Sequence, residues 1–266
     1  MQQPDRIREE DIRSALSPQL SHLAICCHDV IDSTNTEAKR MIGNGFDRDA
    51  IITAAEQTGG RGRLGRSFYS PADTGIYVSY LLHPKGALTD LVSLTAAAAV
   101  AVDRAIRKLT DAKPEIKWVN DLYLDGKKIC GILAETVTRP HANTTAGIII
   151  GIGLNMNTEV FPEELQGIAG SLHAPKIKKS RMIAAIAQEL YALAKDPSNR
   201  SYMEAYRAHS LVLGKRVVFS RGDTKTEAIA IDIDDDGGLR VQLDDGSEQT
   251  LHTGEITLRL SKRDER

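Results

Sequence analysis

The segment AIITAAEQTGGRGRLGR, residues 50–66, joins an apolar run to a loop of glycines and arginines. The apolar run, residues 50–55, predicts a buried β-strand because it is short, aliphatic and free of charge. The loop, residues 59–66, places three arginines among four glycines. Glycines let backbone N–H groups approach a ligand closely, and arginine forks bind carboxylate or phosphate oxygens in bidentate geometry. We interpret the loop as an anion clamp at a strand end, with a solvated basic turn as the alternative.

Two nucleotide-binding motifs resemble this loop but do not fit its surroundings. Gly60, Gly62 and Gly65 have the spacing of the dinucleotide fingerprint, and residues 60–67 differ from a P-loop at Arg66, where lysine belongs. Both motifs need a helix directly after the loop, so that phosphate meets a helix N-terminus. Residues 67–71 read SFYSP, which does not favour a long helix, and the acidic residue of the fingerprint is missing. Both motifs are therefore disfavoured.

Outward from this segment the sequence predicts an α+β domain. Helix signals occupy residues 1–20, 36–42, 89–109 and 181–193. Ser33 or Thr34 can cap the second of these helices, with Glu37 in its first turn. The Asp125-Gly126 dipeptide predicts a hairpin turn. Apolar and β-branched runs predict strands at residues 23–27, 50–55, 76–82, 116–119, 122–124, 128–137 and 145–156.

After about residue 213 the pattern changes to short strands with turn residues between them. The strands are expected at residues 216–219, 227–233, 239–243 and 256–260, and residues 236–238 and 245–246 supply turns. Many short strands with regular turns are typical of a small β-barrel. We therefore expect two domains, residues 1–211 and residues 212–266.

Composition narrows the class of protein. The 266 residues are 41% hydrophobic and 26% charged, which is ordinary for a globular protein. The net charge of -2, with no basic half, argues against a general nucleic-acid binder. The N-terminus lacks the apolar region of a signal peptide, and no apolar run approaches a membrane span. Cys26, Cys27 and Cys130 do not make a disulfide framework, so we expect reduced thiols, a cytoplasmic location and no membrane partner.

A second polar cluster is expected where two short strands meet. Lys117, Trp118, Asn120 and Asp121 join a cation, an aromatic ring, an amide and a carboxylate. The two oxygen-bearing side chains are suited to Mg²⁺ or a ribose, although a simple turn is equally consistent. Lys128 follows the hairpin turn and is placed either to neutralise a phosphate or to face solvent. Residues 151–157, GIGLNMN, end a strand either against a ligand or in a plain turn.

Other metal patterns are incomplete. Residues 232–237 open like a calcium loop, but Leu243 stands where a bidentate glutamate is required, so we expect an acidic hairpin turn. The histidines and cysteines of residues 22–28 lack a usual zinc spacing. We expect no structural metal.

Taken in order, these motifs resemble those of bacterial biotin protein ligases over about residues 30–260. The matching segments are residues 32–35 (DSTN), 60–66 (GRGRLGR), 117–121 (KWVND) with Lys128 and residues 131–133 (GIL), 151–155 and 254–256. Val119 replaces a usual proline, and Phe68 stands where the family often has tryptophan. Lipoate ligases are a related alternative, but their Arg-Arg-x-Ser-Gly-Gly-Gly pattern is absent; a biotin-binding protein without turnover is disfavoured by the complete 117–128 segment.

The resemblance implies a fold and an activity. The fold would be a catalytic domain with a mixed β-sheet, related to class II tRNA synthetases, followed by an SH3-like β-barrel. The activity would be synthesis of biotinyl-AMP from biotin and ATP with Mg²⁺, then transfer to a lysine of a biotin carboxyl carrier protein of acetyl-CoA carboxylase. Repressor members carry a DNA-binding domain before the first motif, where this chain has only about 30 residues. We therefore expect a monofunctional enzyme without a DNA partner, and allow for a homodimer.

The resemblance also assigns roles by position. Arg63, Lys128 and Asp121 would be catalytic, with Asp121 also the metal ligand. ATP would be bound by Arg63, Lys117, Asn120 and Asn155. The ureido end of biotin would be bound by Ser33, Thr34, Asn35 and Gln57, and its chain would be flanked by Gly131 and Gly151. The biotin carboxylate and the phosphate would be bound by Arg61, Gly62 and Arg63, and Lys128 would contact the carboxylate and the α-phosphate.

Overall fold

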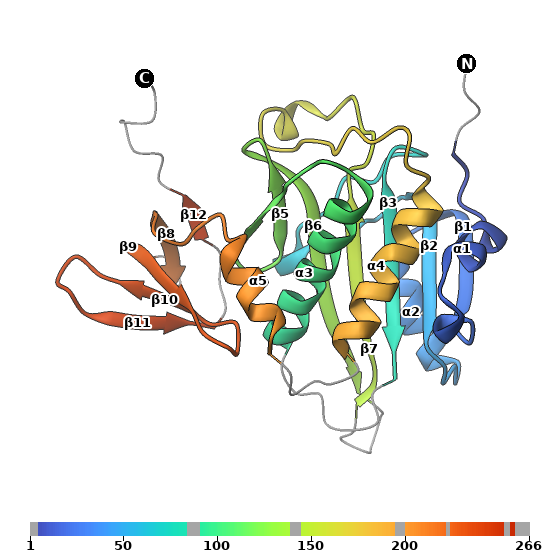
Figure 1. The fold of residues 1–266 in the computed structure, drawn as a ribbon, viewed down its shortest axis with the longest axis horizontal. Coiled ribbons are helices and arrows are strands. Elements are labelled where there is room, and N and C mark those ends of the chain that lie inside the picture. The colour runs from blue at the N-terminus through green and yellow to red at the C-terminus, as the bar shows by residue number, and fades with distance from the viewer. Residues whose placement is uncertain are drawn as a thin grey trace.

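A seven-stranded sheet forms the centre of the larger part of the molecule (Figure 1). The computed structural model describes residues 5–83, 91–138, 145–194, 200–221, 224–252 and 256–258. β1 pairs with β2 in parallel and every other neighbouring pair is antiparallel, so the predicted mixed sheet is confirmed. In spatial order the strands are β1 (Ala24–Ile31), β2 (Ala50–Gln57), β3 (Ile76–Leu82), β7 (Thr145–Leu154), β6 (Lys127–Thr138), β5 (Asp121–Leu124) and β4 (Glu115–Lys117).

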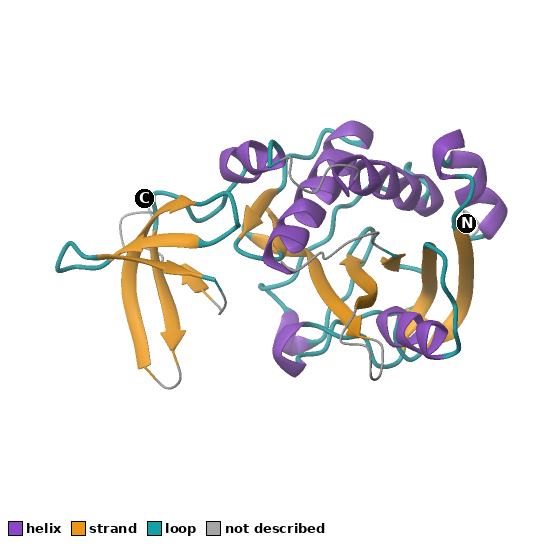
Figure 2. Cartoon of the chain, turned by 90° about the horizontal axis from the view of Figure 1, so that it is seen from below, coloured by secondary structure: helices purple, strands orange, loops and turns teal. Residues whose placement is uncertain are grey.

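Helices cover both faces of this sheet, as Figure 2 shows from below. One face packs against α3 (Leu91–Leu109) and α4 (Lys179–Ala194), with α1 (Glu9–Ala15) against α4 and α5 (Tyr202–Ala208) against α3. The other face packs against α2 (Thr34–Gly43). A sheet that is buried on both sides needs apolar residues at successive positions, and all seven residues of β3 are buried.

Strand periodicity decides which residues face α2. Side chains alternate between the two faces of a strand, and the register aligns Ser79 on β3 with Gly151 on β7 and Leu133 on β6. Gly131, opposite Gly153, therefore lies on this face as well. The α2 face thus carries several glycines where the other face carries isoleucines, which leaves room above the sheet beside α2.

The C-terminal part is a separate five-stranded antiparallel sheet. Its edge strands β11 and β12 do not pair with each other over the described residues, so a closed barrel is not confirmed. In spatial order the strands are β11 (Glu248–Leu251), β10 (Leu239–Gln242), β9 (Thr224–Ile233), β8 (Arg216–Arg221) and β12 (Ile256–Leu258).

The hairpin turn at Asp125-Gly126 and the acidic turn at residues 232–237 are both present as predicted. Asp125 and Gly126 both have positive φ, 50° and 74°, as the predicted hairpin turn requires. The Oδ1 atom of Asp234 accepts backbone N–H groups from Asp236 and Gly238, so residues 232–237 form the expected acidic turn.

Other local predictions were wrong. Of the predicted helix at residues 1–20, the described part from residue 5 is helical only over α1 and a short 3₁₀ turn at Pro18–Leu20, because Pro18 interrupts the segment. Ser33 is at the N-cap position of α2, but its side chain makes no capping hydrogen bond.

The predicted start of the third helix at residue 89 lies outside the described residues. No helix within the described ranges is long and apolar enough to cross a membrane.

Candidate functional site

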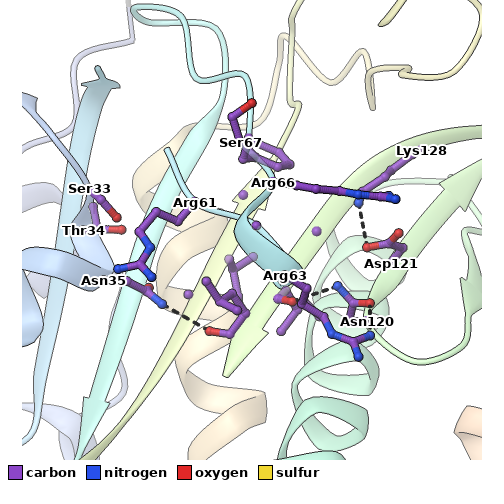
Figure 3. A pocket seen from close by; sticks show the side chains of 18 of the residues that line it. Ser33, Thr34, Asn35, Arg61, Arg63, Arg66, Ser67, Asn120, Asp121 and Lys128 are labelled. Atoms are coloured by element: carbon purple, nitrogen blue, oxygen red, sulfur yellow. Dashed lines mark hydrogen bonds and ion pairs between the residues drawn. The ribbon is translucent and has the colours of Figure 1, made fainter. Parts of the chain in front are cut away.

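A cavity of about 250 Å³ lies on the α2 face of the sheet (Figure 3). It is bounded by the start of α2, the glycine-arginine loop, the loop between β4 and β5, and strands β6 and β7. Every residue to which the sequence analysis assigned a role, except Asn155, lines this cavity. The lining residues are Ser33, Thr34, Asn35, Gln57, Arg61, Gly62, Arg63, Arg66, Ser67, Phe68, Lys117, Trp118, Asn120, Asp121, Lys128, Gly131, Ile132, Leu133, Gly151, Ile152, Gly153 and Ile256.

The glycines of β6 and β7 are required by close approach rather than by backbone conformation. A methyl group on Gly151 would lie 2.1 Å from Oδ1 of Asn35. One on Gly153 would lie 2.4 Å from the Phe68 ring, and one on Gly131 would lie 3.3 Å from both the Phe68 ring and the Lys128 side chain. The side chains of Asn35, Phe68 and Lys128 therefore pack directly against the backbone of β6 and β7, which forms the floor of the cavity.

One end of the cavity is polar and built mainly from amides and hydroxyls. The buried Asn35 directs Oδ1 toward the Ser79 hydroxyl, 2.6 Å away, and that hydroxyl also lies 2.8 Å from Oγ1 of Thr34. Oε1 of Gln57 accepts hydrogen bonds from the Thr34 backbone N–H and hydroxyl. Ser79 has one hydroxyl proton, so at any time it donates either to Oγ1 of Thr34 or to Oδ1 of Asn35. The oxygen that does not receive this proton can accept a hydrogen bond from another group. We call Ser33, Thr34, Asn35 and Gln57 the amide end.

The other end is rich in cations. Nζ of Lys128 lies 2.7 Å from a carboxylate oxygen of Asp121, and Arg63 donates from Nη1 to Oδ1 of Asn120 at 3.0 Å. Figure 3 shows Arg66 extending from the loop toward Lys128. With Lys117, four cations line this end against the carboxylate of Asp121. We call this group the cationic end; its charge favours carboxylate and phosphate ligands.

Arg61 lies at the opposite end from its family-based assignment. Its guanidinium is close to Asn35 (Figure 3), and Nη2 is 3.7 Å from a carboxylate oxygen of Glu135. The expected contact of Arg61 with a carboxylate or phosphate stays a prediction, which requires the side chain to move or its backbone to serve instead.

Asn155 is not brought into the cavity. Its side chain is buried, and Nδ2 donates to the carbonyl of Gly170 at 3.0 Å. That contact joins Asn155 to the segment around Gly170, and neither residue lines the cavity. Its role toward ATP stays a prediction.

The residues at the cationic end do not form a protein cage for Mg²⁺. Asp121, the predicted metal ligand, is paired with Lys128, and Oδ1 of Asn120 is engaged by Arg63. Within the described ranges no group of three or more His, Cys, Asp or Glu side chains could hold a metal ion. Mg²⁺ commonly relies on substrate phosphates and water for most of its ligands. The described side chains therefore do not form a complete magnesium site, and Asp121 as a metal ligand stays a prediction.

Two contributors to the site, Ser79 and Glu135, were missed from the sequence. Both lie in strands outside the motifs, whereas Ile256 on β12 belongs to the matching segment 254–256. A serine in the middle of the apolar run IYVSYLL was the available signal for Ser79. A single sequence contains no comparable signal for Glu135.

Comparison with known proteins agrees with this geometry. Residues 27–155 match the Biotin/lipoate A/B protein ligase family, and residues 212–259 match the Biotin protein ligase C terminal domain. The bifunctional ligase/repressor BirA of Bacillus subtilis is 30% identical over 97% of this chain and 81% of its own length. The biotin–[acetyl-CoA-carboxylase] ligase of Mycobacterium tuberculosis is 34% identical over 78% of this chain and 79% of its own length.

A solved structure of a biotin protein ligase has a similar fold. The biotin protein ligase from Aquifex aeolicus in complex with biotin and ATP superposes with a TM-score of 0.74 at 27% identity. The match covers 90% of this chain and 99% of that chain.

Proposed function

The chain belongs to the biotin protein ligase family, and from this membership we infer that it is an enzyme that joins biotin to ATP as biotinyl-AMP and transfers the biotin to a carboxyl carrier protein. The observation that supports this function best is the polarity of the cavity, with an amide end and a cationic end above one glycine floor. Biotin has the matching polarity, since a neutral urea head is joined by an alkyl chain to a carboxylate.

We propose the following placement of the substrates. The urea head lies at the amide end, where Thr34, Asn35 and Gln57 supply hydrogen-bonding groups. The alkyl chain runs over Gly131 and Gly151. The carboxylate reaches Arg63 and Lys128, where the α-phosphate of ATP joins it; Lys117 and Asn120 border the remaining space for the nucleotide.

In the first step a biotin carboxylate oxygen attacks the α-phosphorus of ATP. A carbon–oxygen–phosphorus anhydride forms, the bond to the β-phosphate breaks, and pyrophosphate leaves. Two anions must approach each other, so catalysis consists of positioning and charge neutralisation rather than covalent participation by the protein. Arg63 and Lys128 are placed for this role at the cationic end.

In the second step the amine of an acceptor lysine attacks the carbonyl carbon of the anhydride. An amide forms and AMP leaves with the bonding electrons of the broken C–O bond. The attacking amine must lose a proton, and Asp121 is the carboxylate that borders this end of the cavity. Its ion pair with Lys128 implies that the lysine must transfer its contact to phosphate before Asp121 orients the amine.

One assay tests the function. The chain is incubated with ATP and Mg²⁺, with biotin or lipoate, and with a biotin carboxyl carrier domain. We expect AMP release and a biotinylated carrier with biotin alone. AMP release that requires lipoate would favour the lipoate ligases of the same family; the absence of biotin-dependent AMP would exclude the function.

The domain boundary, the C-terminal barrel, the location and the oligomeric state are also proposals. We propose a domain boundary between residues 211 and 212, which the start of the C-terminal family match at residue 212 supports. We also propose an SH3-like barrel, which the short-strand pattern and the family resemblance support, a cytoplasmic location, which the lack of a disulfide framework supports, and a homodimer.

A further inference from the structure

Glu135 lies behind the amide end of the cavity and belongs to none of the sequence motifs. It is on β6, on the same face of the sheet as Gly131 and Leu133, and its side chain is 19% exposed. Three groups from two other segments converge on its carboxylate. They are Nδ2 of Asn35 at 2.9 Å, Nζ of Lys39 at 2.6 Å and Nη2 of Arg61 at 3.7 Å.

The contact with Asn35 determines which way the asparagine amide points. A side-chain amide has a donor end and an acceptor end, whereas a carboxylate and a backbone carbonyl can only accept. Glu135 and the carbonyl of Leu133, 3.3 Å away, therefore both require Nδ2 to face β6. Oδ1 must then point toward Ser79 and the floor at Gly151.

This orientation matters for a ligand with N–H groups. Oδ1 of Asn35 is an acceptor at the amide end, and the urea of biotin carries two N–H donors. If the amide turned over, it would present its own N–H groups to those donors. An unmatched buried polar pair reduces affinity by roughly ten- to a hundredfold.

Glu135 is held in its acceptor-only form. Burial raises the pKa of its carboxyl group. Hydrogen bonds from Lys39 and Asn35, together with the positive charges of Lys39 and Arg61, lower the pKa by more than burial raises it. The pKa of Glu135 is therefore below its usual value. The carboxylate is thus ionised at neutral pH, so it does not offer the asparagine a proton.

We propose that Glu135 is a positioning residue that fixes the Asn35 amide with its acceptor toward the ligand, and so determines recognition of the urea N–H groups. This inference rests on the proposed function, because it presumes a ligand with the head group of biotin. Asn35 contacts the ligand, and Glu135 acts only through Asn35.

The first test removes the carboxylate. Glu135→Ala should raise the KM for biotin roughly ten- to a hundredfold, while the KM for ATP and kcat change by less than about threefold. Glu135→Gln keeps an acceptor oxygen and should retain most of the biotin affinity. Lys39→Met removes the neighbouring ion pair but leaves Asn35 bonded to Glu135, so its biotin KM should stay close to that of the wild type.

The second test reverses the hydrogen bond. Asn35→Asp removes the donor and places two carboxylates together, which should weaken biotin binding strongly. Adding Glu135→Gln to that variant supplies a new donor from the β6 side, so the pair is again complementary and an acceptor oxygen still faces the ligand. The double variant should therefore bind biotin at least tenfold more tightly than Asn35→Asp, measured by calorimetry without ATP.

The outcomes distinguish a failure of the proposed function from a failure of the role proposed for Glu135. A wild-type chain without biotin-dependent pyrophosphate release would overturn the proposed function and this inference with it. An active wild type, with an unchanged biotin KM in Glu135→Ala or with no recovery in the double variant, would overturn this inference alone. A Lys39→Met variant as impaired as Glu135→Ala would also overturn it, because the ion pair rather than the amide would then be responsible. Thermal unfolding of each variant identifies loss of folding.

Discussion

Gly151 allows Asn35 to rest on the floor of the cavity. Since an added methyl group would lie 2.1 Å from Oδ1 of Asn35, Gly151→Ala should displace that side chain and raise the KM for biotin at least tenfold. Gly43→Ala, at the end of α2 and with no atom within 4 Å of the new methyl group, is the matched control. Steady-state kinetics on both variants check this, and equal biotin KM values would show that the floor does not press against Asn35.

Arg63 connects the loop to the β4–β5 connection through Asn120, and it belongs to the cationic end. Arg63→Ala should lower the rate of biotinyl-AMP synthesis by roughly a hundredfold or more, because a charge that neutralises the reacting anions is lost. It should also release the adenylate into solution faster, since the loop loses its tether. Pyrophosphate release and retention of labelled biotinyl-AMP on the protein measure the two effects. Retention equal to that of the wild type would contradict the clamp interpretation.

The ionised Glu135 also predicts a pH dependence of stability. A carboxyl group whose pKa is lower in the folded than in the unfolded chain stabilises the fold above its unfolded pKa, and this contribution is lost as the pH falls through the folded pKa. The difference in melting temperature between wild type and Glu135→Gln should therefore be largest near neutral pH and shrink below about pH 4. Calorimetric melting curves from pH 7 to pH 3 test this; a difference that grows in acid would contradict it.

At the residue scale the motifs identified the cavity well. Glycines, arginines and paired polar residues at strand ends indicated a ligand-binding site, because those residue types are unusual at the end of a buried strand. Ser79 and Glu135 were missed because their importance comes from hydrogen bonds to Asn35 on α2, which is more than 40 residues away from either of them in the sequence. The direction of the Arg61 side chain could not be read for the same reason, since Glu135 attracts it.

Among the elements, α3 and α5 hold the strand that precedes the Lys117–Asn120 turn. The fully buried Asp103 on α3 accepts from Nε of Arg107 at 2.8 Å and pairs with Nδ1 of His209 at 2.8 Å. The His209 carbonyl in turn accepts the backbone N–H of Ile116 on β4 at 2.7 Å. This chain of contacts fixes β4 from behind the cavity.

Asp103→Ala should consequently destabilise the protein by about 3 kcal/mol, because it leaves the Arg107 guanidinium and the His209 ring without their buried partner. It should also raise the KM for ATP more than the KM for biotin, since β4 carries Lys117, which we propose borders the nucleotide. Lys108→Ala, also on α3 but exposed, is the control and should cost less than about 0.5 kcal/mol. Urea unfolding and both KM values are measured. A loss below 1 kcal/mol would show that the contacts contribute little.

The predicted elements were correct where the pattern is long and periodic, as in α3, α4 and the central strands. Boundaries were less accurate where the tertiary structure decides. The second helix begins at Thr34, two residues before the predicted start, and the side chain of Ser33 lines the cavity instead of capping the helix. A sequence signal for a cap cannot distinguish a serine that bonds its own helix from one that faces a ligand.

At the scale of the whole molecule, the C-terminal sheet contributes residues and contacts to the site. Ile256 on β12 lines the cavity, and Nε1 of Trp118 donates to the carbonyl of Gly237 at 2.8 Å. The Tyr206 hydroxyl donates to the carbonyl of Val119 at 3.0 Å. The β4–β5 connection is therefore held at Trp118 by the C-terminal sheet and at Val119 by α5, the last helix before that sheet. The sequence predicted a second domain, but not that it would touch the central motif, because nothing in the short-strand pattern indicates its partner.

Trp118 makes this contact measurable, because it is the single tryptophan of the chain and only 4% exposed. Gly237 has φ +84°, and a methyl group there would lie 2.9 Å from Val92, so Gly237→Ala should push the β9–β10 turn away from Trp118. Tryptophan emission should shift to the red, acrylamide quenching should increase, and the KM for ATP should rise. Gly246→Ala imposes the same strain at φ +82° in a turn with no neighbour within 4 Å, so it should leave the emission unchanged. If the two variants behaved alike, backbone strain alone would explain the effect and the C-terminal sheet would not position the central motif.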